Sequence, residues 1–318
     1  MTDAQQILAL SGGIGGAKLA LGLYRELPGN TLSVLCNTGD DFRHLNLHIS
    51  PDIDTVLYTL AGLSNRELGW GREGETWTFM HALESIGGAS WFRLGDGDLA
   101  LHVERTRRLH GGESLSAVMD DIRQRLQVHA RILPMCDQPV PTLVHTTQGT
   151  LPFQQYFVKL QCAPVVTGFE FHAAALAQPS AALLELLSSN ALQAIIICPS
   201  NPFISIDPIL AVPGLREALR NCAAPVIAVS PVIGGAAVKG PTAKMMAELS
   251  MPVSAKAVAR HYGDLLDGFV LDHADADLAD DLPLACRVTQ TWMRSDEDKR
   301  ALAREVMDFA HSLRRSIS

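Results

Sequence analysis

The chain has 318 residues, of which 47% are hydrophobic and 19% are charged; it can therefore bury a substantial core, and disorder over most of its length is excluded. Its formal net charge of −8 argues against a nucleic-acid partner, which requires a clustered basic surface. The sequence contains neither a signal-peptide pattern nor an apolar run of membrane-spanning length, so we expect a cytoplasmic protein with no membrane partner.

The first forty residues alternate between strand and helix patterns. Residues 7–10 form a short apolar run that ends in glycines, residues 17–27 carry apolar side chains at helical spacing, and residues 31–39 form a second apolar run. The helical pattern stops at Pro28-Gly29. A strand, a glycine-rich turn, a helix and a strand in this order predict a βαβ unit and therefore a parallel sheet.

The region 56–128 has a different character, because four segments in it are typical of helices joined by loops. We interpret residues 56–128 as a helical insertion subdomain, and residues 1–55 and 129–318 as a Rossmann-like nucleotide-binding core. The predicted fold class is α/β, a doubly wound, mostly parallel sheet with a helical insertion.

The strand pattern resumes after the insertion. Residues 141–159 are typical of a hairpin that turns at Gln148-Gly149, and the last segment is typical of an amphipathic helix with Ser295 as its N-cap. Further strands are predicted at 130–135, 192–200 and 224–235, with outer strands at 269–272 and 286–291.

The glycine-rich stretch SGGIGGAK, residues 11–18, follows the first strand and opens the first helix. Backbone N–H groups and the positive end of the helix dipole receive anions at such a turn, so we predict a phosphate-binding site here. Gly13-x-Gly15 agrees with the dinucleotide fingerprint, but Lys18 stands where that fingerprint has glycine or alanine. The alternative is a tight turn that requires glycine for its backbone alone.

Four carboxylates follow this turn closely, in NTGDD (37–41) and PDIDT (51–55): Asp40, Asp41, Asp52 and Asp54. An NAD enzyme would need one acid at this place, for the ribose hydroxyls. Four acids beside a phosphate site indicate a hard divalent cation, Mg²⁺, which would bridge them to a diphosphate. Solvated loop carboxylates are the alternative.

Two later strands end in polar residues. PSNPFISI (199–206) places Ser200 and Asn201 after a buried strand, and SPVIGG (230–235) does the same with Ser230 after the next one. Buried polar groups at these ends need partners, which a base or a ribose would provide. The stretch FRLGDGD (92–98) carries Arg93 and is typical of a polar surface turn.

These segments resemble, in this order, the CofD family, the 2-phospho-L-lactate and phosphoenolpyruvate transferases of coenzyme F420 biosynthesis. The matching motifs are SGGIGGAK (11–18), NTGDD (37–41), SPDIDTVLY (50–58), LGDGDLALH (94–102), ILPMCDQPV (132–140), PSNPFISIDPIL (199–210) and SPVIGG (230–235).

The resemblance implies a Mg²⁺-dependent transferase. A phospho-acid moiety would move from its guanosine diphosphate conjugate to the ribityl hydroxyl of FO (7,8-didemethyl-8-hydroxy-5-deazariboflavin), with release of GMP. The moiety could be 2-phospho-L-lactate, phosphoenolpyruvate or 3-phosphoglycerate, and the chain departs from the family pattern at Gln138, where the family usually has an acid. Small-molecule partners and a homodimer are expected.

The site residues implied by the resemblance fall into four groups. Asp40 and Asp52 are the expected metal ligands, and Asp54 and Arg93 are the expected contacts to FO. Asp54 is also the candidate general base because it is the nearest acid in sequence, and Lys18 is a candidate for neutralising charge. The guanine-nucleotide and phosphate contacts are expected at Gly12, Gly13, Gly15, Gly16, Lys18, Ser200, Asn201, Ser230 and Gly234.

Two other functions are compatible with the residues themselves. An NAD(P)-dependent oxidoreductase of Rossmann type would be stabilised by NAD(P) without a metal, and a non-catalytic nucleotide-binding regulator would bind nucleotide without turnover. The transferase requires Mg²⁺-dependent stabilisation by GDP or GMP.

Overall fold

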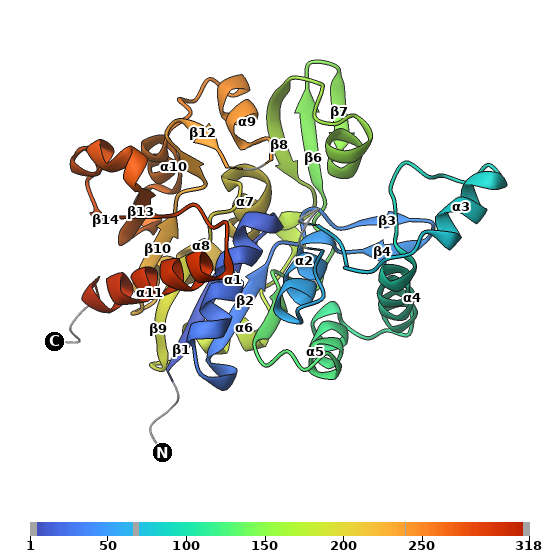
Figure 1. Ribbon diagram of the computed structural model, residues 1–318, viewed down its shortest axis with the longest axis horizontal. Helices are drawn as coiled ribbons and strands as arrows, with labels where there is room; N and C mark the ends of the chain where they lie inside the picture. The colour runs from blue at the N-terminus through green and yellow to red at the C-terminus, as the bar shows by residue number, and fades with distance from the viewer. Residues whose placement is uncertain (1–4, 66–69, 239, 314–318) are drawn as a thin grey trace.

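The computed structural model describes residues 5–65, 70–238 and 240–313, and its centre is one parallel sheet (Figure 1). Seven strands lie in the order β14-β13-β10-β9-β1-β2-β5, each parallel to its neighbours. Their bounds are β1 Gln6–Ser11, β2 Leu32–Cys36, β5 Arg131–Pro134, β9 Leu192–Ile197, β10 Val226–Val229, β13 Gly268–Asp272 and β14 Ala285–Thr289. The predicted α/β class with a doubly wound parallel sheet is confirmed.

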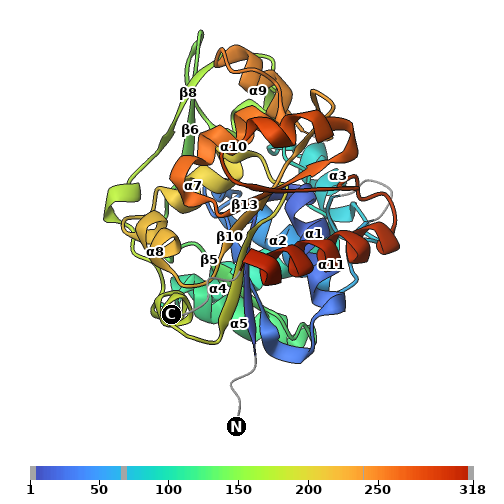
Figure 2. The same cartoon turned by 90° about the vertical axis from the view of Figure 1, so that its left-hand side faces the viewer.

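Helices cover both faces of the sheet because its inner strands are apolar on both faces. On β1, Ala9 packs with the helices of one face, and its neighbour Leu10 packs with those of the other. The first face carries α1 Gly13–Glu26, α2 Pro51–Leu60, α5 Leu115–Arg125 and α11 Asp296–Leu313. The second face carries α6 Ala181–Leu187, α7 Asp207–Leu210, α8 Leu215–Asn221, α9 Thr242–Glu248 and α10 Ala255–Tyr262. Figure 2 shows α1 and α11 on one side of the strands and α8 and α10 on the other.

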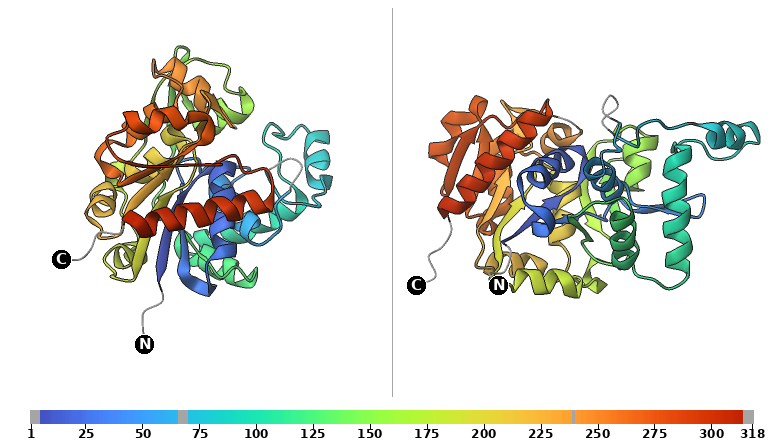
Figure 3. Two further views of the ribbon diagram at one scale, coloured as in Figure 1. Left: turned by 60° about the vertical axis from the view of Figure 1, so that its left-hand side comes forward. Right: turned by 60° about the horizontal axis from the view of Figure 1, so that its bottom comes forward.

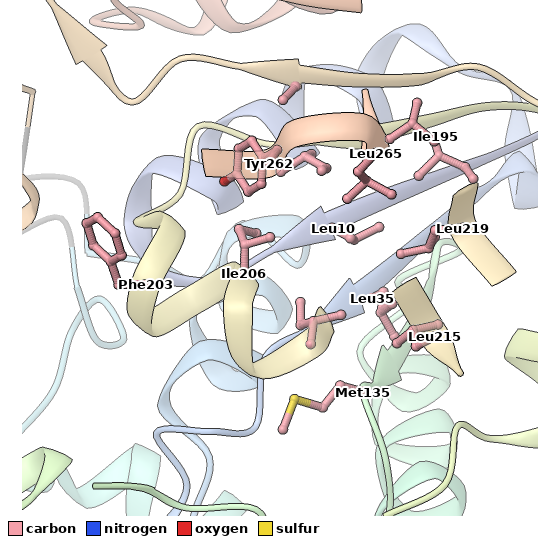
Figure 4. Packing of buried hydrophobic residues seen from close by; sticks show 14 of the residues in the cluster. Leu10, Leu35, Met135, Ile195, Phe203, Ile206, Leu215, Leu219, Tyr262 and Leu265 are labelled. Atoms are coloured by element: carbon pink, nitrogen blue, oxygen red, sulfur yellow. The ribbon is translucent and has the colours of Figure 1, made fainter. Parts of the chain in front are cut away.

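The second face is a continuous apolar core. Figure 4 shows Leu10 and Leu35 of the sheet among Ile206, Leu215 and Tyr262 in one apolar cluster, and all five are buried. This packing fixes the segment after β9 against the carboxyl end of β1. Since β2 lies on one side of β1 and β9 on the other, this edge is also the point at which the strand order reverses, where open α/β sheets bind ligands.

Between β2 and β5 the chain forms a protruding arm, which consists of the hairpin β3 Phe42–His44 and β4 Leu47–Ile49, the helix α3 Thr78–Ser85 and the helix α4 Asp96–His110. Figure 3 shows α3 at the far end of this arm. Ile49, Met80 and Leu94 form a small core of its own. By contrast, α2 crosses residue 55 and shares the sheet's core with α5. The division into 1–55 with 129–318 and 56–128 therefore stays a prediction.

A smaller antiparallel sheet follows β5, with β6 Thr142–Thr146 between β7 Gly149–Pro152 and β8 Val166–Phe171. The predicted hairpin is confirmed, with its turn at Thr147-Gln148, one residue before the predicted Gln148-Gly149, because Gly149 already pairs with Thr146. The strand β8 was not predicted, because its half-exposed sequence VTGFEF includes a glycine and lacks the apolar run of the inner strands. Two further strands, β11 Val232–Ile233 and β12 Ala236–Ala237, pair after β10. The short helical turns are η1 Gly29–Thr31, η2 Gln155–Lys159, η3 Ala174–Leu176, η4 Pro202–Ile206, η5 Gly263–Leu265 and η6 His273–Asp281.

The last helix begins as predicted. Asp298 N donates to Ser295 Oγ at 3.1 Å, and Ser295 N donates to Asp298 Oδ2 at 2.8 Å, so each residue caps the other. In the described part of the chain, no helix has both the length and the apolar character needed to cross a lipid bilayer.

Candidate active site

The glycine turn after β1 packs directly against the loop after β9. Gly12 N donates to Ser200 Oγ at 3.1 Å. A Cβ atom on Gly12 would lie 2.5 Å from Ser205 Cβ, which leaves no room for any other residue. Gly13 has a φ of +65°, a conformation that glycine adopts without strain. The turn therefore requires glycine at both positions.

Asp52 is at the centre of hydrogen bonds that connect three of the sequence motifs. It lies in the first turn of α2 and is 7% exposed. Its Oδ1 accepts from Gly13 N at 2.6 Å, and its Oδ2 accepts from Asn37 Nδ2 at 2.9 Å. Asn37 Nδ2 also donates to Ile204 O at 3.1 Å, and Asn37 Oδ1 accepts from Gly39 N at 2.7 Å. The strand ends of β1, β2 and β9 thus meet around this carboxylate.

Asp40 is buried near Asp52, and none of the ion pairs found among the described residues compensates its negative charge. It is 6% exposed, and its Oδ1 accepts no hydrogen bond from the residues that the structure describes. Burial, together with the charges of Asp52 and Asp41, raises the pKa of Asp40 well above its usual range. Burial likewise raises the pKa of Asp52 to about 6, although the hydrogen bonds from Asn37 and Gly13 oppose the shift.

We call Asp40 and Asp52 the acidic centre. Two buried carboxylates without a cationic partner must either bind protons or be neutralised by a bound cation. Their oxygens, one of them without a hydrogen bond, are the ligand type that a hard cation such as Mg²⁺ prefers. The residues of the acidic centre therefore fit a divalent cation.

The other two acids of the cluster have partners. Asp41 Oδ2 accepts from Ser50 Oγ at 2.8 Å and lies 3.1 Å from His48 Nε2. Asp54 accepts from Arg105 through both oxygens, at 2.5 Å from Nη1 and 2.9 Å from Nη2. Arg105 is fully buried. It was missed in the sequence because it lies in the charge-rich stretch HVERTRRLH of α4, where an arginine normally faces solvent.

Asp54 and Arg93, the predicted contacts to FO, line the same pocket, which has a volume of about 290 Å³. The guanidinium carbon of Arg93 lies 4.3 Å from the ring centroid of Trp77. We call this cavity the aromatic pocket; its lining includes Tyr58, Trp70, Trp77, Phe92, Arg93, Asp54, Asp98 and His102.

The two acids of the LGDGD motif have different roles. Asp96 accepts from Thr78 N at 3.0 Å and from Phe79 N at 3.1 Å, so it caps α3. Asp98 lines the aromatic pocket and accepts from Tyr58 Oη at 2.6 Å. The motif is therefore more than the surface turn that was considered in the sequence.

Among the described residues, one group of three could hold a metal ion by proximity alone, namely Asp54, Asp98 and His102. Arg105 already donates to Asp54 and lies 2.8 Å from His102 Nδ1. Its positive charge occupies the place that a cation would take. Within the described part of the chain no ion pair is found for Asp40 or Asp52, so the acidic centre is the better candidate.

The remaining predicted residues make contacts within the chain. Ser230 Oγ donates to Val232 O at 2.7 Å, and Gly234 N donates to Asp275 Oδ2 at 2.9 Å. Asn201 Oδ1 accepts from Phe203 N at 3.0 Å. These contacts shape the loops after β9 and β10, at the same edge of the sheet as the glycine turn.

Three more predicted residues belong to α1. Gly15 and Gly16 both face the loop after β9, since a Cβ on Gly15 would meet Pro199 O and one on Gly16 would meet Ser200 Oγ. Lys18 Nζ donates to Met293 O at 3.1 Å, in the loop before α11. No contact in the structure tests whether these residues bind nucleotide, so that role stays a prediction.

The sequence matches known proteins along almost its whole length. The family model described as "2-phospho-L-lactate transferase CofD" matches residues 7–307. The chain is 40% identical over 318 residues to the phosphoenolpyruvate transferase of Streptomyces griseus, covering 97% of this chain and 99% of that protein. It is 36% identical over 311 residues to the 2-phospho-L-lactate transferase of Methanocaldococcus jannaschii, covering 96% and 99%.

A solved structure supports the fold independently. A protein of the UPF0052 family from Bacillus halodurans superimposes with a TM-score of 0.65 at 13% sequence identity, covering 96% of this chain and 100% of that one. Together, the fold and the sequence matches define an α/β enzyme that transfers a phosphate-containing group. The chain belongs to the CofD family of transferases of coenzyme F420 biosynthesis, which confirms the resemblance seen in its motifs.

Proposed function

We propose that this enzyme moves a phospho-acid moiety from its guanosine diphosphate conjugate to the ribityl hydroxyl of FO and releases GMP. The observation that carries the proposal is the position of the acidic centre, between the glycine turn and the aromatic pocket. Asp52 hydrogen-bonds Gly13 on one side, and its neighbours Pro51 and Asp54 line the pocket on the other. A diphosphate at the first place and an alcohol in the second would meet at the acidic centre.

Asp40 and Asp52 would hold Mg²⁺. The cation would neutralise the diphosphate and stabilise the charge that develops on the departing GMP. Because Gly13 N–H already donates to Asp52, we infer that this amide orients the metal ligand and that the diphosphate contacts other amides at the N-terminus of α1. A cation held in this way would account for the four acids near the glycine turn.

The aromatic pocket suits the acceptor. FO contains a flat, extended ring system, and such rings stack on aromatic side chains and guanidinium groups. Arg93 is already stacked on Trp77, which holds its planar face in a fixed orientation. The same pocket is also lined by the polar groups of Asp54, Asp98 and His102, which would contact the hydroxyls of the ribityl chain.

The transferred acid is 2-phospho-L-lactate, phosphoenolpyruvate or 3-phosphoglycerate. Phosphoenolpyruvate transferases and 2-phospho-L-lactate transferases match this chain at similar identity, 40% and 36% for the two relatives described above. Overall likeness therefore does not choose the donor. Parallel assays with the three conjugates, compared by kcat/KM, would make the choice.

The proposed function is tested by incubating the purified chain with FO and each conjugate, with and without Mg²⁺, and by measuring GMP and the phosphodiester product by mass spectrometry. We expect both products in equal amounts, and only with a divalent cation. Turnover that is unaffected by a chelator would refute the metal assignment. Stabilisation by NAD(P) without formation of either product would favour an oxidoreductase, and GDP binding without turnover would favour a regulator.

The proposal also includes a homodimer in the cytoplasm. Light scattering on the purified chain and fractionation of the producing cells would test these two points. A monomer that is fully active would remove the dimer from the proposal without affecting the reaction.

A further inference from the structure

The aromatic pocket contains a chain of polar contacts that the sequence did not reveal and that bears on proton removal from the acceptor. It runs through four buried or half-buried residues of α2 and α4: Arg105, His102, Asp98 and Tyr58. A role for these residues in proton removal rests on the proposed function, in which an alcohol in the pocket attacks a phosphate.

Asp54 is poorly placed to be the base. Both of its oxygens accept from Arg105, and its side chain is 7% exposed. The guanidinium is itself fixed, because its Nε and Nη2 donate to His48 O at 3.2 and 3.1 Å. A proton that arrived on Asp54 would break a buried, bidentate ion pair, which is strongly unfavourable.

Asp98 has the accessibility that Asp54 lacks. Its side chain is 20% exposed, and it lines the aromatic pocket. Tyr58 Oη donates to its Oδ1 at 2.6 Å, and His102 Nε2 lies 3.1 Å from its Oδ2. An ionised carboxylate offers about four acceptor positions on its two oxygens, so these two neighbours leave capacity for a substrate hydroxyl.

The contact between Arg105 and His102 sets the tautomer of the imidazole. Arg105 Nη2 lies 2.8 Å from His102 Nδ1. A guanidinium can only donate, so Nδ1 must accept, and the proton of the neutral imidazole lies on Nε2, on the side of Asp98. With one nitrogen accepting and the other protonated, His102 cannot itself be the base. It orients Asp98.

We propose that Asp98, rather than Asp54, receives the proton of the attacking hydroxyl, and that Arg105, His102 and Tyr58 are positioning residues. The hydroxyl oxygen forms a bond to the phosphorus that carries the small acid. The bond from that phosphorus to the bridging oxygen breaks, and its electron pair leaves with GMP. The hydroxyl proton passes to Asp98 and then to solvent.

The electrostatics agree with a carboxylate that is ionised at neutral pH. Burial raises the pKa of Asp98, but hydrogen bonds from His102 and Tyr58 and the charge of Arg105 outweigh it, so the pKa lies below its usual range. The charged and titratable groups around Asp98 are Asp54 and Tyr58 from α2, His102 and Arg105 from α4, and Arg72, Glu75 and Arg93 from the other pocket walls.

The main test compares Asp98→Asn with the wild type and with Glu104→Gln, an exposed acid on the same helix that pairs with Arg107. We expect Asp98→Asn to lower kcat by about 100-fold or more, the usual contribution of a general base, and to change the KM for FO by less than about threefold. The acidic limb of its kcat–pH profile should disappear. Glu104→Gln should match the wild type.

Two further variants separate positioning from simple folding. His102→Leu and Tyr58→Phe each remove a contact that lowers the pKa of Asp98, so the acidic limb should move to higher pH. His102→Gln, whose amide can still donate, should restore much of the wild-type profile. An acidic limb that stays in place in both deletion variants would overturn the positioning roles.

The outcomes distinguish this inference from the proposed function. If the wild type releases GMP and Asp98→Asn keeps a kcat within threefold of it, the inference is wrong and the function stands. If Asp54→Asn folds, abolishes the acidic limb and leaves KM unchanged, Asp54 is the base and the inference is wrong. A wild type that releases no GMP overturns both.

Discussion

The acidic centre and the aromatic pocket both bury carboxylates only a few residues apart in sequence, but they balance the negative charge differently. In the acidic centre, Asp52 is held by neutral amides from Gly13 and Asn37. In the pocket, Asp54 is held by the guanidinium of Arg105. The same residue type is therefore held by neutral donors in one place and by an internal ion pair in the other, and only the first place is proposed to bind a cation.

This difference agrees with the ligand proposed for each region. A carboxylate that is already paired with arginine contributes little to holding a metal, but it leaves a nearly neutral wall against which an organic ring can pack. An ionised buried carboxylate without a cationic partner stays in an unfavourable state unless it binds a proton or a cation. Counting acids in the sequence could not separate the two cases, because the partner that separates them is 51 residues away from Asp54.

The largest expected effect is on the free energy of unfolding and comes from removing the ion pair between Arg105 and Asp54 in the pocket. Arg105→Met would leave Asp54 buried without its partner and should lower the free energy of unfolding by about 3–5 kcal/mol, as measured by chemical denaturation. Arg107→Met is a matched control on the same helix, because that arginine is 68% exposed in its pair with Glu104; its loss should change stability by less than about 1 kcal/mol.

The double variant Arg105→Met/Asp54→Leu sharpens the test, since it removes both charges at once. It should recover part of the lost stability, because the penalty comes from the unpaired charge rather than from the missing bond. Equal losses in Arg105→Met and in the double variant would show that the pair does not balance charge.

The next largest effect concerns the acidic centre. Asp40→Asn and Asp52→Asn should each lower kcat by about 100-fold or more, equivalent to about 2.7 kcal/mol of transition-state stabilisation. Asp41→Asn should lower it by less than about tenfold, because Asp41 is engaged with His48 and Ser50. Near-normal rates for both of the first two variants at limiting Mg²⁺ would remove the metal assignment.

The comparison also explains how far the sequence could predict the molecule. The sheet, the hairpin, the helix caps and the residues at the ends of β1, β2 and β9 follow from local patterns, and each lies where its motif indicated. The role of Arg105 does not, because its charge pattern is the same as that of exposed arginines on the same helix. The contact between Tyr58 and Asp98 joins residues 40 positions apart, and only the fold brings them together.

A third prediction concerns stability in the absence of a divalent cation. The pKa of Asp40 is raised by burial and by the charge of Asp52, and the pKa of Asp52 is raised to about 6. A raised folded-state pKa means that stability is fully present below the unfolded pKa, near pH 4, and is lost as the pH rises through the folded value. The chelated wild type should therefore lose part of its stability between about pH 4 and pH 6.

Asp40→Asn removes one of these groups. With a chelator at pH 7.5, the variant should melt higher than the wild type, by roughly 2 °C for each kcal/mol regained, and the difference should shrink as the pH falls towards 4. Added Mg²⁺ should raise the Tm of the wild type and reverse the order. A variant that melts lower at pH 7.5 in chelator would contradict the view that the acidic centre carries uncompensated charge.

The smallest expected effect is on the KM for FO and comes from replacing Arg93 in the aromatic pocket. Arg93 stacks on Trp77 at 4.3 Å, and both line the cavity proposed for FO. A planar guanidinium can continue that stack onto a deazaflavin ring or hold its polar edge, and a lysine ammonium does this less well. Arg93→Lys should therefore raise the KM for FO by about 3–10-fold, and the GDP affinity measured by calorimetry should stay unchanged.

The control is Arg43→Lys, on the exposed hairpin, which should change neither quantity. If Arg93→Lys weakened GDP binding and left the response to FO unaltered, the arginine would belong to the nucleotide site, and the division between a metal-binding centre and an acceptor pocket would have to be redrawn at this residue.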